Sequence, residues 1–111
     1  MLSRLHLLIT LSVILLSACR MPVEVTGQGF IYGQLSGETY SDGYLFDINE
    51  DFEEIFWPIP APGYSFTRWT DICDRTYGPC ELNLTRELWE QDREVPLGSR
   101  FKPGYRGPLA L

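Results

Sequence analysis

Apolar and polar residues alternate along several short stretches after residue 22, and this period of two is typical of half-buried β-strands. The stretches expected to form strands are residues 23–25, 30–35, 44–46, 55–61, 64–69, 82–84 and 95–101. Gly27 and Gly29 lie between the first two, where a tight turn or bulge uses backbone angles open to glycine. The pattern predicts a small, mostly antiparallel β domain.

Two prolines, Pro58 and Pro60, fall inside the stretch 55–61. Proline has no N–H to donate to a neighbouring strand, so it belongs on a sheet edge or at a bulge. The sequence therefore predicts that this strand lies at a sheet edge or is interrupted by a bulge.

The stretch 64–69 contains a break in its alternation. Trp69 is out of phase by one residue with Tyr64 and Phe66, which share one face. One extra residue near Thr67 or Arg68 would form a β-bulge and return the indole to the core face.

One segment has helical spacing. In residues 85–94, Leu88 and Trp89 follow Leu84 at intervals that place all three on one side of a helix, and Thr85 is a candidate N-cap. We expect a helix of two or three turns here. With the strands, it predicts an α+β domain that is mostly antiparallel sheet.

The start of the chain has a different pattern. Arg4 precedes an apolar segment from Leu5 to Ala18, which is shorter than the roughly twenty residues that span a bilayer. A positive start, a short apolar centre and small residues at its end are typical of a secretory signal peptide. We expect residues 1–18 to be this signal.

The sequence Leu16-Ser17-Ala18-Cys19 resembles the lipobox of bacterial lipoproteins. The resemblance implies a diacylglycerol on the Cys19 sulfur, cleavage before this residue, and acylation of the new amino terminus by a fatty acid such as palmitate. Two or more acyl chains hold a protein stably on a membrane, whereas one holds it only marginally. The alternative is an ordinary signal peptide followed by an incidental cysteine.

Arg20 follows the cysteine, where the lipoproteins of many enteric-type bacteria carry an aspartate that retains them at the inner membrane. By resemblance, the expected location is the outer membrane of a two-membrane cell, facing the periplasm or the surface. Residues 19–24 are expected to be the lipidated N-terminus and tether, residues 25–102 the β domain, and residues 103–111 a flexible tail.

Composition narrows the class of partner. Removal of residues 1–18 leaves 93 of the 111 residues, enough for one modest core. Arg4 leaves as well, so eight basic residues face fifteen acidic ones and the formal net charge changes from −6 to −7. An acidic surface does not suit a nucleic-acid binder.

All fifteen aromatic residues follow residue 18. They would supply a core, or an exposed platform for a sugar or peptide. Core packing is the expectation, with both Trp57 and Trp69 buried.

The most acidic stretch, residues 47–54, begins like a calcium loop, because its first, third and fifth positions carry oxygen ligands from Asp47 onward. The sixth position is Phe52, where such a loop needs glycine, and the twelfth is Pro58, where it needs glutamate. We expect a solvated loop or helical turn and no metal site.

Residues 61–84 resemble the divergent internalin-type B-repeat domain, also called the bacterial repeat domain. The matching positions are Ala61, Pro62, Gly63, Tyr64, Phe66, Trp69, Cys73, Pro79 and Cys80. The resemblance covers about residues 23–102, and only its central part is specific. Asp71 and Ile72 depart from the glycine common near the tryptophan, and the acidic insertion is longer than usual. The resemblance implies a β-grasp-like module, used as a spacer or adhesive element, with no assigned catalytic residues.

Export would place Cys73 and Cys80 in an oxidising compartment, where a disulfide is the expected state. Six residues separate them, including Gly78-Pro79, which can turn the chain back. Closing this eight-residue loop would stabilise the fold by about 2.5 kcal/mol. A redox pair usually has two intervening residues and a zinc site needs four ligands, so both fit less well.

The single histidine, His6, lies in the expected signal, so the mature chain would have no imidazole. Its loss argues against Ser-His-Asp, Cys-His and histidine zinc sites. Carboxylate pairs are left, but they carry no specificity among fifteen acidic residues. No catalytic residue, cofactor or metal is expected, and an enzyme is the least favoured class.

The expected function is that of a lipid-anchored envelope lipoprotein with a non-catalytic binding or structural module. Its partners would be the membrane, through the N-terminal lipid, and an envelope protein or glycan, with no nucleic acid. The alternative is an inhibitor or accessory factor whose acidic face binds a basic envelope protein, such as a lysozyme-like hydrolase. Salt would weaken such binding.

Overall fold

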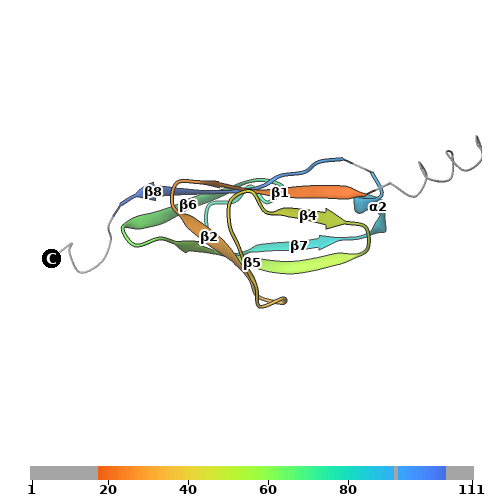
Figure 1. The fold of residues 1–111 in the computed structure, drawn as a ribbon, viewed down its shortest axis with the longest axis horizontal. Helices are drawn as coiled ribbons and strands as arrows, with labels where there is room; N and C mark the ends of the chain where they lie inside the picture. The colour runs from red at the N-terminus through yellow and green to blue at the C-terminus, as the bar shows by residue number, and fades with distance from the viewer. Residues whose placement is uncertain (1–17, 92, 105–111) are drawn as a thin grey trace, which may run out of the picture.

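The structure is a computed structural model that describes residues 18–91 and 93–104. It contains two four-stranded sheets and one short helix within these residues (Figure 1). The elements are β1 Cys19–Thr26, β2 Gly29–Gly33, β3 Thr39–Tyr40, β4 Leu45–Ile48, β5 Phe52–Pro60, β6 Tyr64–Asp71, β7 Cys80–Leu84, α2 Arg86–Trp89 and β8 Leu97–Pro103. The expected signal up to residue 17, with His6, and the expected tail from residue 105 lie outside the described residues.

The strand orders are β4-β1-β8-β6 and β3-β2-β5-β7. We call these the first and the second sheet. All neighbouring strands are antiparallel except β1 and β8, which are parallel. The expectation of a mostly β domain with one short helix is confirmed. The finer expectation of a β-grasp arrangement is not, because the strands divide into two sheets instead of forming one sheet under a long helix.

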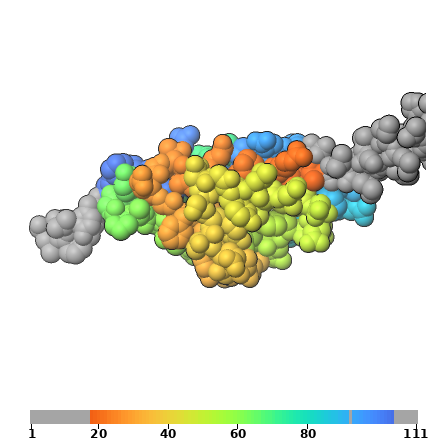
Figure 2. All heavy atoms as spheres, in the orientation of Figure 1, coloured from red at the N-terminus to blue at the C-terminus, as the bar shows by residue number. Residues whose placement is uncertain are grey.

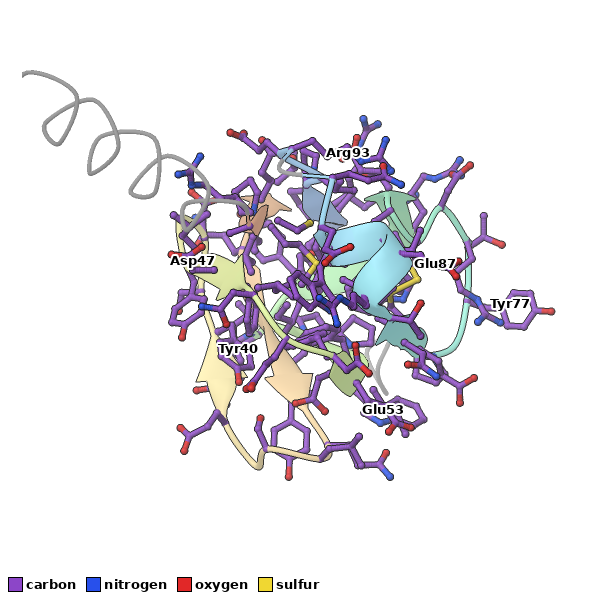
Figure 3. The ribbon with its side chains drawn as sticks, turned by 90° about the vertical axis from the view of Figure 1, so that its right-hand side faces the viewer. Tyr40, Asp47, Glu53, Tyr77, Glu87 and Arg93 are labelled. Carbon is purple, nitrogen blue, oxygen red and sulfur yellow. A yellow bond between two sulfur atoms is a disulfide. The ribbon has the colours of Figure 1, made fainter. Side chains whose placement is uncertain are left out.

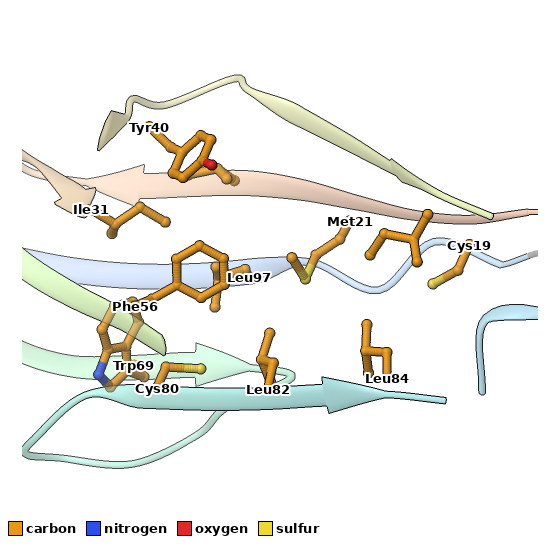
Figure 4. Packing of buried hydrophobic residues seen from close by; sticks show 12 residues of the cluster. Cys19, Met21, Ile31, Tyr40, Phe56, Trp69, Cys80, Leu82, Leu84 and Leu97 are labelled. Carbon is orange, nitrogen blue, oxygen red and sulfur yellow. The ribbon is translucent and has the colours of Figure 1, made fainter. Parts of the chain in front are cut away.

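The core lies between the two sheets (Figure 4). Met21 and Leu97 of the first sheet meet Ile31 and Phe56 of the second, and each side chain is at most 1% exposed. Trp69 of β6 is fully buried among them. A core of this kind forms because alternate residues of each strand point to the same side.

The predicted bulge is confirmed. The pairing of β6 with β8 shifts register between Phe66 and Arg68, and this shift brings Trp69 onto the core side. The indole N–H then donates to the carbonyl oxygen of Gly78 at 2.9 Å. A buried indole needs such an acceptor.

The prediction of an edge strand or a bulge at the prolines is wrong, because β5 lies between β2 and β7 and pairs with both without a register shift. β5 pairs with β2 through residues 56–60 but with β7 only through residues 52–56. Backbone groups in antiparallel pairs alternate between the two neighbours. The Ala61 amide donates to the Gln28 carbonyl, so residues 57 and 59 also direct their backbone hydrogen bonds toward β2. The backbones of both prolines therefore face the opposite side, where β7 no longer pairs with β5. Neither proline removes a bond between strands.

The helix is shorter than expected. α2 has four residues, Arg86–Trp89, where two or three turns were predicted. Its first turn has no side-chain cap from Thr85, and the chain then runs on to bond with β1. Figure 3 shows this single turn covering one end of the sandwich, where it closes the core beyond Leu84.

The segment expected to be a tether lies in a strand. β1 begins at Cys19, and its buried side chains alternate from there through Met21 and Val23. Arg20 bonds with Arg93 and Val95 through its backbone, so this end of β1 is held on both sides. The alternation that predicts this strand is already present in the sequence from residue 19. Pro103, the first residue of the tail expected from the sequence, is the last residue of β8.

The disulfide between Cys73 and Cys80 is confirmed, with Cα atoms 5.9 Å apart. It closes the loop that contains Gly78, the acceptor of the Trp69 indole. Cys80 is fully buried, so the bridge connects this loop to the core at the start of β7.

Candidate functional site: an aromatic outer face

The second sheet carries apolar side chains on its outer side as well as on its inner side. In β2, Phe30 and Tyr32 flank the fully buried Ile31, so they point outward. In β5, Trp57 follows the fully buried Phe56 and points the same way. These side chains are partly open to solvent: Phe30 is 36% exposed and Trp57 40%.

The sheet register brings these residues side by side. Phe30 lies opposite Ile59, and Tyr32 lies opposite Trp57. Directly opposed residues have Cβ atoms about 5 Å apart. The four side chains therefore form a continuous block, which we call the aromatic face.

The indole of Trp57 is held in place by a neighbouring side chain. Its N–H donates to the Oε1 atom of Gln34 at 2.7 Å. The polar edge of the ring is thus satisfied within the protein, while much of the ring stays accessible. A partner would meet an indole whose orientation is fixed beforehand, which reduces the entropy cost of binding.

A buried carboxylate supports the loop that carries Gln34. Glu54 is only 3% exposed and accepts hydrogen bonds from the amides of Leu35 at 2.7 Å, Ile55 at 2.9 Å and Ser36 at 3.2 Å. Burial tends to raise the pKa of Glu54, but these bonds outweigh it and hold the pKa below its ordinary value. The carboxylate therefore stays charged and keeps the loop against the sheet.

Gly33 makes room for this arrangement. A Cβ atom at Gly33 would lie 2.6 Å from the Oε2 atom of Glu54. The Ser36 hydroxyl lies 3.0 Å from that of Tyr40, which connects the loop to β3. Loop 34–38 is thus fixed at both ends beside the aromatic face.

Polar groups surround the aromatic face. Thr39 lies opposite Tyr32 on one side, and on the other Glu81 lies opposite Ile55 and Asn83 opposite Glu53. Hydroxyl, amide and carboxylate groups can give hydrogen bonds to a ligand that rests on the rings. An apolar centre with a polar surround is the usual composition of a binding surface.

The outer side of β1 and β8, the two central strands of the first sheet, is different. The residues of β1 and β8 that point away from the core and into solvent are Arg20, Glu24, Thr26, Arg100 and Lys102. A polar outer side is ordinary for a sheet that faces water. The aromatic outer side of the second sheet therefore needs a separate explanation, and exposed apolar patches of this kind often mark interaction sites.

The prediction that Trp57 is buried is wrong. The alternation of residues 55–61 correctly separated two faces, but it did not say which one points inward. A chain of this size covers only the inner side of each sheet, so apolar residues on both faces of one strand leave one face exposed. Apolar residues on both faces of one strand, in a chain this short, are therefore the sequence feature that predicts an exposed aromatic face.

Cys19 lies at one end of the sandwich, away from the aromatic face. It is a free thiol, 3% exposed, whose side chain points into the core (Figure 4). Burial raises the pKa of this thiol, against an opposing effect of the Arg93 charge. A mostly apolar cavity of about 130 Å³ adjoins it, lined also by Ile72, Leu84, Leu88, Arg93 and Val95.

The acidic stretch 47–54 is divided between elements. Asp47 lies on β4, Asp51 accepts a hydrogen bond from the Trp89 indole at 3.0 Å, and Glu54 supports loop 34–38. In the part of the chain that the structure describes, no three His, Cys, Asp or Glu side chains stand where they could hold a metal ion. Within the same residues, no helix is long and apolar enough to cross a bilayer.

No protein-family model, no curated protein and no solved structure matches this chain. Its function is therefore inferred from its own residues and their arrangement, above all from the aromatic face.

Proposed function

We propose that this protein is a lipid-anchored envelope lipoprotein whose β domain binds an envelope glycan on the aromatic face. The observation that carries the proposal is the state of Trp57, a ring that is exposed yet held by Gln34 within a block of apolar side chains. Burial of such rings by a ligand removes apolar surface from water. No bond has to be broken inside the protein for that to happen.

The composition of the face favours a sugar. A sugar ring has a flat C–H side that packs on aromatic rings and hydroxyl groups that bond at its edge. Gln34 and Thr39 are exposed amide and hydroxyl groups beside the rings, and Asn83 lies farther along the sheet, opposite Glu53. Glu53 and Glu81 flank the same face, so a neutral or basic glycan fits better than a polyanion.

The position of Cys19 is compatible with a lipid anchor. Cys19 starts β1 at one end of the sandwich, whereas β8 ends at the other (Figure 1). The aromatic face follows the side of the domain between these ends, so an anchor at Cys19 leaves it open. A lipid on the sulfur would require the Cys19 side chain, which is 3% exposed, to turn out of the core; the cavity beside it is also lined by Leu88, which is 41% exposed.

The disulfide supports the proposed compartment. A bridge between Cys73 and Cys80 persists in oxidising surroundings such as the bacterial envelope. Placement at the outer membrane, and a relation to B-repeat modules through residues 61–84, belong to the same proposal. The two-sheet arrangement gives no support to a β-grasp module.

A cosedimentation experiment tests the binding proposal. The purified domain, residues 19–111, is mixed with insoluble peptidoglycan sacculi, and the bound fraction is compared for wild type, Trp57→Ala and Tyr77→Ala. We expect Trp57→Ala to bind about tenfold more weakly, as removal of a central aromatic residue at a binding surface often does. Tyr77 is 73% exposed on the disulfide loop, so Tyr77→Ala removes an even more accessible ring elsewhere and should bind normally.

Wild-type protein that stays in the supernatant, or equal loss of binding in both variants, would contradict the glycan proposal. The anchor is tested separately by metabolic labelling of the full chain with a radioactive fatty acid. Cys19→Ala should remove the label and leave the precursor uncut, and a labelled variant would contradict the lipid assignment.

A further inference from the structure

β4 is an open edge of the first sheet. It is the outermost strand in the order β4-β1-β8-β6, and within the described residues no strand pairs with its other side. The Val23 amide of β1 donates to the Tyr44 carbonyl at 2.7 Å. Because alternate residues direct their backbone groups to the same side, Phe46 and Ile48 also form their backbone hydrogen bonds with β1. The N–H and C=O groups of Leu45 and Asp47 therefore point away from the sheet. They are free to pair with another strand.

A groove follows this edge. It has a volume of about 350 Å³ and is lined by residues 44–52. In Figure 2, the segment around β4, in yellow, lies in the middle of the face toward the viewer. The open edge and the groove are thus parts of one accessible surface.

Aromatic rings line the inner side of the groove. Phe46 packs on Phe52 with ring centroids 5.4 Å apart and on Tyr40 at 4.7 Å. Tyr44 extends the cluster and is 47% exposed. Alternate side chains of an added strand would meet this cluster, whereas the others would lie beside Leu45, which is 50% exposed.

The rim of the groove is acidic. Asp47, Glu50 and Asp51 lie within the stretch that lines it and are exposed. Within residues 18–91 and 93–104, none of these three carboxylates belongs to an ion pair. Arg20 of β1 lies opposite Asp47 of β4 and offsets part of the negative charge. The remaining charge would attract lysine and arginine side chains.

We infer that β4 and its groove bind an extended, basic segment of a partner protein as an added strand. Main-chain bonds to Leu45 and Asp47 would supply affinity, and the aromatic groove with its acidic rim would select alternating apolar and basic side chains. This surface is separate from the aromatic face. The inference therefore does not depend on glycan binding.

The other edges fit this role less well. At the β6 edge, the Trp69 amide already donates to the Arg75 carbonyl, so the disulfide loop covers part of it. β3 has only two residues. β7 is open beyond β5 and carries Glu81 and Asn83, but it offers fewer carboxylates than the rim beside β4.

The test uses a synthetic peptide of about eight residues that alternates lysine and valine, a length suited to one strand. The matched control has the same sequence with an N-methyl group on every residue, which keeps its charge but removes the main-chain donors from both edges. Binding to the purified domain is measured by NMR titration, and hydrogen exchange of individual amides shows where the peptide lies.

We expect the unmethylated peptide to bind about tenfold more tightly than its methylated form, since about two main-chain hydrogen bonds are lost. The amides of Leu45 and Asp47 should exchange more slowly in the complex. Higher salt should weaken binding, because the rim contributes through charge.

Variants separate the edge from the overall charge. The double variant Asp47→Asn with Glu50→Gln should bind the peptide several-fold more weakly. Glu81→Gln removes a charge at the β7 edge and should have a small effect, and Trp57→Ala should have none. Absence of peptide binding, equal binding of both peptides, or protection at Glu81 and Asn83 in place of β4 would overturn the inference. None of these outcomes bears on glycan binding by the aromatic face.

Discussion

Two tryptophans from strands that follow one another in the chain but belong to different sheets have opposite surroundings. Trp69 is fully buried, and its indole N–H donates to Gly78 at 2.9 Å; Trp57 is 40% exposed, and its N–H donates to Gln34 at 2.7 Å. Both indole N–H groups have a hydrogen-bond acceptor, so hydrogen bonding does not distinguish the two tryptophans. They differ in what lies over the ring. The other sheet covers Trp69, whereas the described residues leave much of Trp57 open.

This difference shows which parts of the molecule serve the fold and which are available for binding. Around Trp69, the bulge in β6, the disulfide loop and the opposite sheet all contribute to one packed core. Around Trp57, a buried Glu54 and loop 34–38 hold an exposed ring in place. The arrangement around Trp57 buries little apolar surface in the core, so its main effect is to present an exposed aromatic surface.

The largest difference between the two regions should appear on truncation. Trp69→Ala removes a fully buried ring and should lower the free energy of unfolding by about 3–5 kcal/mol. Urea denaturation followed by circular dichroism measures this change. A loss below about 1 kcal/mol would mean that the ring is not part of the core.

The disulfide should have the next largest effect. Replacement of both Cys73 and Cys80 by serine should lower the free energy of unfolding by about 2.5 kcal/mol through the eight-residue loop that they close. The loop also holds the acceptor for Trp69, so Trp69 fluorescence should respond as well. Urea denaturation of the oxidised and reduced wild type provides the matched comparison. Equal stability of the two forms would contradict the role given to the bridge.

Glu54 connects the two regions and should show a pH-dependent effect. Its pKa is lower in the folded protein than in the unfolded chain, so it stabilises the fold above the unfolded value of about 4.3. That contribution is lost as the pH falls through the lower, folded pKa. Glu54→Gln should lower the free energy of unfolding at pH 7 by about 1–3 kcal/mol, because three amides lose a charged acceptor.

The pH dependence shows whether the charge of the Glu54 carboxylate causes this difference in stability. As the pH falls below about 4.3, the usual pKa of a glutamate, wild type should lose more stability than Glu54→Gln, so the two curves converge on acidification. Glu53→Gln is the matched control, since Glu53 is exposed on the neighbouring position of β5. Parallel curves for wild type and Glu54→Gln would show that the charge of Glu54 does not support the loop.

The smallest stability effect should come from Trp57. Trp57→Ala leaves the core intact and should change the free energy of unfolding by about 1 kcal/mol or less. Urea denaturation beside Trp69→Ala measures the contrast directly. A loss as large as that of Trp69→Ala would make the aromatic face a second core.

Much of the fold could be predicted because local chemistry decides it. The bulge near Trp69 follows from one residue that is out of phase with the rest of its strand. Pairing of Cys73 with Cys80 follows from the short spacing and the Gly78-Pro79 turn. Each of these depends on residues close together in the chain.

The remainder depends on distant pairings. Nothing near Cys19 shows that β1 will pair with both β4 and β8, so the strand was interpreted as a tether. The phase of β5 separates two faces, but only the division into two sheets decides that Trp57 points outward. The sequence around Glu54 predicts a solvated acidic stretch, because two of its three amide partners, Leu35 and Ser36, lie about twenty residues earlier.

The contrast between the two tryptophans is tested most directly by fluorine NMR of protein labelled with 5-fluorotryptophan. Trp57→Phe and Trp89→Phe assign the signals, and a soluble paramagnetic agent broadens those of solvent-exposed rings. The structure predicts strong broadening for Trp57 and little for Trp69. Equal protection of both signals would contradict an exposed aromatic face, and with it the proposed binding surface.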